Sequence, residues 1–386
     1  MTFDISAESP PTSLSQPARA VAAAQDPATF SLPGRRMLLA GPLVAVLTMA
    51  AALLTTDAAG VPLRDPDNVT GNRLLMAVTL IMVLFAIDVV VRTWHRSEGR
   101  WPTPAALLAV RREQWTLSRW LAVAGAIVAY YVTYLAYRNL KSVVPLLRPN
   151  DLFDQQLADF DRGLFAGHDP AALLHDALGT GLAAHVFSGT YMLFFLFIPG
   201  TLAVALVFSR NLRSGLFYAT ALSLNWGLGA ASYFLLPSLG PVYIAPGAFT
   251  AVANTDAGQL QALLLEERTV FLRDPVLGTA QSIGAFASLH VSIFVTAALA
   301  AHLLGLHRAI KAVAWILVVL TVGATIYLGW HYVADDLGGL VIAVLALALA
   351  RALTGIDLHT TRRQARVADI NVRAPRRRAG SAPDPS

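Results

Sequence analysis

Long apolar runs constrain this chain more than any other feature of its sequence. A helix needs roughly 20 predominantly apolar residues to cross a bilayer, and runs of that length recur along most of the chain. Charged residues make up only 14% of its 386 residues, whereas soluble domains average about 25%. The sequence therefore predicts an all-α fold, a polytopic membrane bundle of about eight transmembrane helices. The expected spans are 37–56, 74–92, 120–140, 183–208, 213–236, 287–305, 311–330 and 332–352.

Basic residues gather on one side of these runs, and cytoplasmic loops of membrane proteins are enriched in Lys and Arg. We therefore expect a protein of the cell membrane with both termini in the cytoplasm and with segments 141–182 and 237–286 outside. Within them, 150–178 and 254–268 mix polar residues with spaced apolar ones, which predicts amphipathic helices along the outer surface. The net charge of +5 fits these topology signals and does not indicate nucleic acid. The basic segments are Arg35–Arg36, Arg96–Arg112, Arg210–Arg213, Arg308–Lys311 and the arginine-rich end of the chain.

Composition divides the chain into four parts. Residues 1–34 are rich in Ala, Pro and Ser, and 356–386 add many arginines, so we expect two disordered cytoplasmic tails. Residues 35–119 hold a transmembrane hairpin and a basic cytoplasmic loop. Residues 120–355 hold the remaining six runs and all the polar residues to which we assign chemistry.

Two histidines and a carboxylate bracket the last three runs. Between His290 and His331 lie two apolar runs separated by a short basic break, which predicts a hairpin that returns both histidines to one membrane face. Asp335 follows His331 by one helical turn. A neutral imidazole held by a carboxylate can attack phosphorus, and a second histidine can protonate the leaving oxygen. Alternatively, His331 is an interfacial residue, and Asp335 or Asp336 is an acid that favours a helix start.

Three further residues suit a phosphoryl group. Ser288 offers a hydroxyl at a helix start, where free N–H groups bind anions. Lys141 and Arg148, in KSVVPLLRP, fall on the expected outer side, where topology disfavours cations. The alternatives are a plain N-cap serine, a snorkelling lysine and an ordinary loop arginine. The pair of cations makes a metal less favourable, so we expect neither metal nor cofactor, and the lack of cysteine excludes thiol catalysis.

These motifs resemble a known family. KSVVPLLRP, FASLH and HYVAD are similar, in order, to the Lys-x6-Arg-Pro, Pro-Ser-x-His and His-x3-Asp motifs of the type 2 phosphatidic acid phosphatase (PAP2) superfamily, over roughly residues 120–350. The resemblance implies a PAP2-like catalytic domain at 120–355. It makes His331 the nucleophile, Asp335 its orienting partner and His290 the acid. The substrate phosphate would be bound by Lys141, Arg148 and Ser288.

The chain departs from that pattern in two motifs. Ala287 stands where the family usually has Pro, and Ala324 and Thr325 stand where it has Ser-Arg, so that one phosphate-binding arginine is missing. Arg268 and Arg273 are candidates to replace it. With LPSLGPVY and the acidic DLFDQQLADFDRGLF, these departures make the chain look more like the inositolphosphotransferase branch, which includes the inositol phosphorylceramide synthases.

The sequence thus predicts a membrane phosphotransferase or phosphatase that acts on a lipid phosphate or lipid-linked head group. The alternatives are a simple lipid phosphatase acting on phosphatidate or prenyl pyrophosphate, and a non-enzymatic transporter, which would place charges at helix midpoints. We assign His185 and Asn225 to helix–helix hydrogen bonds. Tyr243 either lines the pocket or anchors the chain at the interface. The lipid donor, the acceptor and the oligomeric state are left open.

Overall fold

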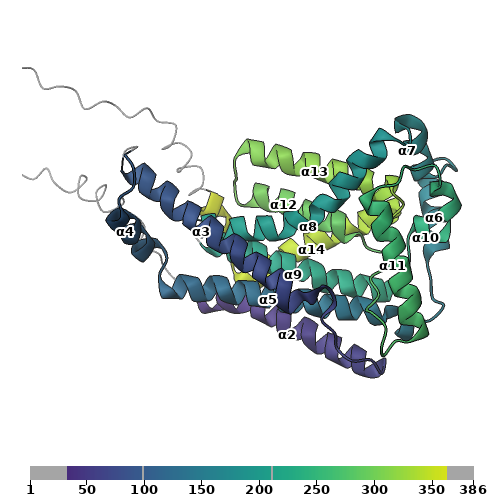
Figure 1. The fold of residues 1–386 in the computed structure, drawn as a ribbon, viewed down its shortest axis with the longest axis horizontal. Coiled ribbons are helices and arrows are strands. Elements are labelled where there is room, and N and C mark those ends of the chain that lie inside the picture. The colour runs from purple at the N-terminus through teal and green to yellow at the C-terminus, as the bar shows by residue number, and fades with distance from the viewer. Residues whose placement is uncertain (1–32, 98–99, 210–211, 363–386) are drawn as a thin grey trace, which may run out of the picture.

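A computed structural model describes residues 33–97, 100–209 and 212–362 of the protein, and within them every regular element is a helix. Long helices run side by side along the long axis, with α4 (Pro104–Gln114) at one end and a group of shorter helices at the other (Figure 1). The predicted all-α bundle is confirmed. The two expected tails lie almost entirely outside the described residues, and of the second one 358–362 are helical.

Six helices of the described chain are long and apolar enough to cross a membrane. Each coincides with a predicted span, so the apolar runs locate these helices correctly. The six are α2 (Arg35–Ala58), α3 (Leu74–Arg96, preceded by the π-helix Val69–Arg73), α5 (Leu117–Leu147), α8 (Leu182–Phe208), α13 (Arg308–Tyr327) and α14 (Val333–Thr354).

The other two predicted spans are also helices, but of a different character. Helix α12 (Leu289–Leu303) has only 15 residues, fewer than a typical membrane crossing requires. Helix α9 (Leu212–Leu235) buries polar Thr220, Ser223 and Asn225. It packs against α2, α5, α8, α12 and α14, so it lies inside the bundle, where protein rather than lipid surrounds its side chains.

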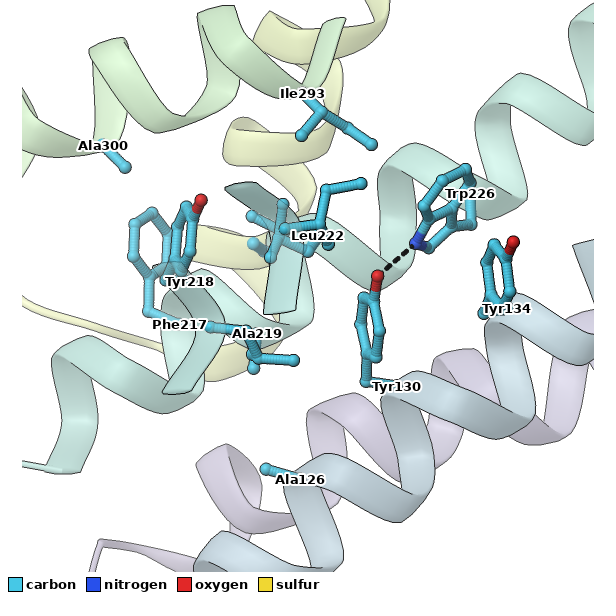
Figure 2. Packing of buried hydrophobic residues seen from close by; sticks show 14 of the residues in the cluster. Ala126, Tyr130, Tyr134, Phe217, Tyr218, Ala219, Leu222, Trp226, Ile293 and Ala300 are labelled. Carbon is cyan, nitrogen blue, oxygen red and sulfur yellow. Dashed lines mark hydrogen bonds between the residues drawn. The ribbon is translucent and has the colours of Figure 1, made fainter. Parts of the chain in front are cut away.

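Aromatic and polar side chains join the central helices. The indole Nε1 of Trp226 on α9 donates to the Tyr130 hydroxyl on α5 at 3.0 Å (Figure 2). Asn225 donates to Thr296 Oγ1 on α12 at 3.0 Å and accepts from Ser292, which confirms its helix–helix role. His185, by contrast, is exposed on α8.

The short helices at the far end of the bundle come from the two long segments expected to lie outside. Both predicted amphipathic stretches form helices, but on α6 the buried face holds Asp154, Leu157 and Asp161. Two of these three positions are acidic rather than apolar. The helices at this end are α6 (Asp154–Leu164), α7 (Pro170–Leu178), α10 (Pro241–Ile244), the 3-10 helix Pro246–Phe249 and α11 (Asp256–Arg273); the 3-10 helix Pro66–Asn68 precedes α3.

Candidate active site

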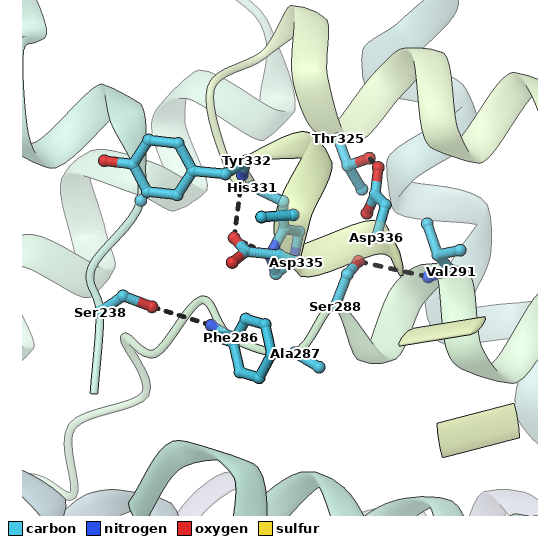
Figure 3. Close-up of polar contacts among 12 residues, drawn as sticks. Ser238, Phe286, Ala287, Ser288, Val291, Thr325, His331, Tyr332, Asp335 and Asp336 are labelled. Atoms are coloured by element: carbon cyan, nitrogen blue, oxygen red, sulfur yellow. Dashed lines mark hydrogen bonds and ion pairs between the residues drawn. The ribbon is translucent and has the colours of Figure 1, made fainter. Parts of the chain in front are cut away.

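His331 and Asp335 lie together where the chain turns from α13 into α14. The predicted seventh span extends to residue 330, but α13 ends at Tyr327 because Gly329 takes a left-handed φ of +70°. His331 therefore precedes α14 instead of lying on a helix. Its Nδ1 is 3.3 Å from Asp335 Oδ2, and the side chains are 7% and 0% exposed (Figure 3).

Asp335 contacts two groups with the same carboxylate oxygen. Its Oδ2 accepts the Tyr332 backbone N–H at 2.9 Å as well as facing the His331 ring. The two interpretations of Asp335, as a partner of histidine and as an acid at a helix start, are thus compatible. Burial lowers the pKa of His331 to about 4, and the charge of Lys141 acts in the same direction, while Asp336 opposes it. His331 is therefore a neutral imidazole at pH 7.

His290, in the first turn of α12, faces this pair. Its ring stacks on Tyr191 and Phe194 of α8, with centroid distances of 4.0 and 3.9 Å. The His290 and His331 ring centroids are 6.2 Å apart. The Nε2 atom of His290 is buried and has no hydrogen-bond partner. The ring is thus fixed by stacking while one nitrogen stays available to a bound molecule.

Both histidines line one cavity of about 390 Å³, within the usual size range of ligand sites. Lys141 lines it too, and its Nζ lies 4.7 Å from the centre of the Tyr233 ring. Tyr243 is among the lining residues, as one of the two interpretations predicts. Much of the remaining wall is aromatic, from Tyr134, Tyr137, Tyr191, Phe194, Phe195, Trp226, Tyr233, Tyr243 and Trp330.

The cavity has cationic residues that the sequence analysis missed. Arg138 lies one turn before Lys141 on α5 and lines the same wall, where it donates to Ser282 Oγ, and Arg73 lines it as well. The spacing of Arg138 and Lys141, three residues apart, was the signal available in the sequence.

Arg148 lies in an adjoining cavity of about 270 Å³, which shares Lys141 and Tyr233 with the first. Its Nε donates to Asp151 Oδ2 at 2.6 Å, and its Nη1 donates to the Phe234 carbonyl. Arg268 lines this second cavity, whereas Arg273 is exposed at the end of α11.

Ser288 ties the two histidine-bearing segments together. It is the N-cap of α12, its Oγ accepts the Val291 N–H at 3.4 Å, and its own N–H donates to the Asp335 carbonyl at 2.9 Å (Figure 3). The N-cap prediction is therefore confirmed. Thr325, at the position of the missing arginine, donates instead to Asp336 Oδ2 at 3.0 Å.

The sequence profile of the PAP2 superfamily matches residues 155–349, half of the chain. The chain belongs to this superfamily. The matched segment contains Ser288, His290, His331 and Asp335 and begins after Lys141 and Arg148. No curated protein and no solved structure shows a significant match. In the described part of the chain, no group of three or more His, Asp or Glu side chains is placed to hold a metal ion. Membership and the helical bundle together make this a membrane protein of the phosphatase type.

Proposed function

We propose that this protein is a membrane phosphotransferase or phosphatase that acts on a lipid phosphate or a lipid-linked phospho-head group through a phosphohistidine. One observation carries the proposal. A neutral imidazole held by a buried carboxylate, His331 with Asp335, faces the unpartnered Nε2 of His290 across a cavity that also contains Lys141. These are the parts of a nucleophile, its orienting group, an acid and a phosphate-binding cation.

In the proposed first step, His331 Nε2 attacks phosphorus while Nδ1 is held by Asp335. The N–P bond forms, the P–O bond to the leaving alcohol breaks, and His290 Nε2 donates a proton to that oxygen. In the second step His290 accepts the proton of an incoming hydroxyl, whose oxygen forms a new bond to phosphorus as the N–P bond breaks. His290 and His331 thus end in their starting protonation states.

Lys141, Arg148 and Ser288 are the proposed binding groups for the phosphoryl oxygens. Lys141 is the cation common to both cavities, so a phosphate beside His331 lies within the field of its charge. Arg148 would act from the adjoining cavity, at the junction that Lys141 and Tyr233 form. Ser288 stands at the α12 N-terminus, where the helix dipole favours an anion.

The molecule that receives the phosphoryl group distinguishes transfer from hydrolysis. The departures at Ala287 and Thr325 and the aromatic wall of the cavity support an inositolphosphotransferase-like reaction, in which a lipid or polyol hydroxyl is the acceptor. Simple hydrolysis of a lipid phosphate is the second candidate, and membership of a superfamily typified by phosphatases favours it. Both reactions use the same histidines.

We also propose that the site faces the outside of the cell membrane. Helix α4 lies at the end of the bundle opposite α6, α7 and α11, and α13 begins with the basic residues Arg308 and Lys311 at its end farther from those helices (Figure 1). A reporter inserted at Leu277, which is 85% exposed, should read external, and one at Lys311 should read cytoplasmic. The reverse result would move the site to the cytoplasmic face.

Acid-quenched trapping of labelled phosphate on the purified protein tests the mechanism. The substrates are phosphatidate, a prenyl pyrophosphate, phosphatidylinositol and an activated ester, each with and without an added lipid alcohol. His331→Ala should trap no label and show no turnover. His290→Ala should still trap label from the activated ester, whose leaving group needs little protonation. The exposed His302, which accepts from Trp315 Nε1, provides the control variant His302→Ala. Label that persists in His331→Ala would refute the phosphohistidine.

A further inference from the structure

Helix α6 presents buried carboxylates to the segment that carries His331. Asp154 and Asp161 are each 3% exposed, although α6 lies outside the bundle of long helices. Asp159, between them on the same helix, is exposed and accepts hydrogen bonds from Gln155 and Arg162 of its own helix. Buried carboxylates are costly unless hydrogen bonds compensate, so the partners of Asp154 and Asp161 show what the buried face of α6 is for.

Asp161 caps helix α14. Its Oδ2 accepts the Val333 N–H at 2.7 Å, and its Oδ1 accepts the Ala334 N–H at 3.1 Å. The N–H groups at a helix start have no partner within the helix. The neighbouring Tyr332 N–H is taken by Asp335 at 2.9 Å. A carboxylate from a distant part of the chain thus completes the cap of the helix whose first turn holds the partner of His331.

Asp154 connects the same turn to a second loop. Its Oδ1 accepts from the Tyr332 hydroxyl at 3.2 Å and from the Gly240 N–H at 2.9 Å, and both of its oxygens accept the Leu239 N–H at 3.0 Å. Gly240 has φ +106°, and a Cβ there would lie 2.4 Å from the Trp330 carbonyl oxygen. The loop at 239–240 therefore lies directly against the backbone that precedes His331.

An apolar contact joins the two carboxylates. Leu157, one turn after Asp154 on the same face of α6, packs in a small buried cluster with Tyr332 and Ala334. Three consecutive positions of this face thus contact the residues that immediately follow His331. These contacts of α6 restrain both the position and the orientation of the turn that carries His331.

We propose that Asp161 and Asp154 are positioning residues, which hold the His331 turn and the α14 N-terminus in the geometry that phosphoryl transfer needs. This inference rests on the proposed function of His331. The reason for the requirement is geometric: the Nδ1–Oδ2 distance of 3.3 Å is already long for a hydrogen bond, so a small shift of the turn would separate His331 from Asp335. Misplacement of reacting groups by about 1 Å can cost on the order of 100-fold in rate.

The test compares Asp161→Ala, Asp161→Asn and the matched control Asp159→Ala in the purified full-length protein. Turnover of an activated phosphate ester is measured, normalised to folded protein by a thermal melt in detergent. Asp161→Ala should lower kcat by about 10- to 100-fold with little change in KM. Asp161→Asn keeps one of the two oxygens that accept N–H groups, so its kcat should lie between those of Asp161→Ala and the natural protein. Asp159→Ala should match the natural protein.

Tyr332→Phe tests the Asp154 half without threatening the fold, because it removes only the hydroxyl. It should lower kcat about threefold at constant KM. Unchanged kcat in both Asp161→Ala and Tyr332→Phe would overturn the proposal. So would a loss in Asp161→Ala that disappears on normalisation to folded protein. If His331→Ala abolishes labelling while Asp161→Ala is fully active, the positioning role fails alone; if His331→Ala keeps its label, the proposed function fails.

Discussion

Two buried polar clusters of the helical bundle differ in how the oxygens of their carboxylates are satisfied. In the Asp88 cluster, both carboxylate oxygens of Asp88 are bonded, to Arg92 Nε at 2.8 Å and to Trp115 Nε1 at 3.1 Å. Arg119 lies over the Trp115 ring and donates to the Val207 carbonyl at 2.8 Å. Side chains and backbone from α3, α5 and α8 are joined in this way.

The histidine cluster, comprising His290, His331, Asp335 and Asp336, is incomplete by comparison. His290 Nε2, Asp335 Oδ1 and Asp336 Oδ1 are buried without a hydrogen-bond partner. Each such group costs about 1–3 kcal/mol, and two members of the cluster, His290 and His331, line the 390 Å³ cavity. The difference teaches that a carboxylate with both oxygens bonded holds helices together, whereas unsatisfied atoms beside a cavity mark a place for a ligand.

The largest expected effect comes from Asp335→Asn. The amide keeps the shape of the side chain but no longer holds the His331 tautomer, and the equivalent change in a Ser-His-Asp triad costs about 10⁴-fold in kcat. We expect turnover to fall by orders of magnitude, measured with the labelled lipids above. The thermal midpoint should change little. Activity within tenfold of the natural protein would place Asp335 with the structural carboxylates such as Asp88.

Arg148→Ala should have the next largest effect. Removing one group that stabilises the developing charge costs about 2.7–4 kcal/mol in comparable sites, so kcat should fall by about 100- to 1000-fold. The control is Arg162→Ala, which removes a partly exposed arginine that pairs with Asp159 on the same helix. Because Arg148 lines the adjoining cavity, near-normal turnover would show that its role is confined to its bonds with Asp151 and Phe234.

Asp88→Ala should lower stability and leave activity unchanged, the opposite of what we expect for Asp335→Asn. It leaves the Trp115 indole N–H without its acceptor and Arg92 without its ion pair, which should cost about 1–3 kcal/mol of stability. Activity per folded molecule should stay unchanged, because no residue of the cluster lines the cavity. A thermal melt in detergent and a turnover assay on the same sample measure both. Loss of activity in fully folded Asp88→Ala would show that the two clusters are coupled.

Much of the fold could be predicted from the sequence because lipid imposes length and apolarity on each span. The predicted spans at α9 and α12 are helices, but they differ from a typical membrane crossing: α9 buries polar residues inside the bundle, and α12 is short. The end of α13 was placed three residues too late because the apolar run continues past Gly329, whose φ ends the helix. The turn that holds His331 is therefore longer than the predicted spans allow.

The sequence predicts the residues of the candidate site that are close together along the chain, but not the distant residues that contact them. Asp335 follows His331 by four residues, and Ser288 directly precedes α12. Spacing along the sequence is enough to predict both positions. Asp161 and Asp154 act on residues more than 80 positions away, and their segment has a pattern typical of a surface helix. Only the packing of α6 reveals which of its acids are buried. Arg138 was missed for a similar reason, since its cavity is assembled from distant helices.

The smallest expected effect is that of mild acid on the rate. His331 attacks phosphorus as a neutral imidazole, and burial lowers its pKa to about 4 from an ordinary value of about 6.5. A lowered pKa means that the neutral form persists on acidification. With an activated ester, whose leaving group needs little proton donation from His290, kcat/KM should therefore stay nearly constant between pH 7 and 5.5. It should fall only as the pH approaches 4. A phosphodiester substrate avoids the second phosphate ionisation near pH 6, and Lys141→Gln, which removes a charge that lowers the pKa, should move the acid limb upward. If kcat/KM instead fell with a midpoint near pH 6.5, His331 would be as well hydrated as an ordinary surface histidine. The histidine cluster would then not differ from a solvated polar group in its chemistry.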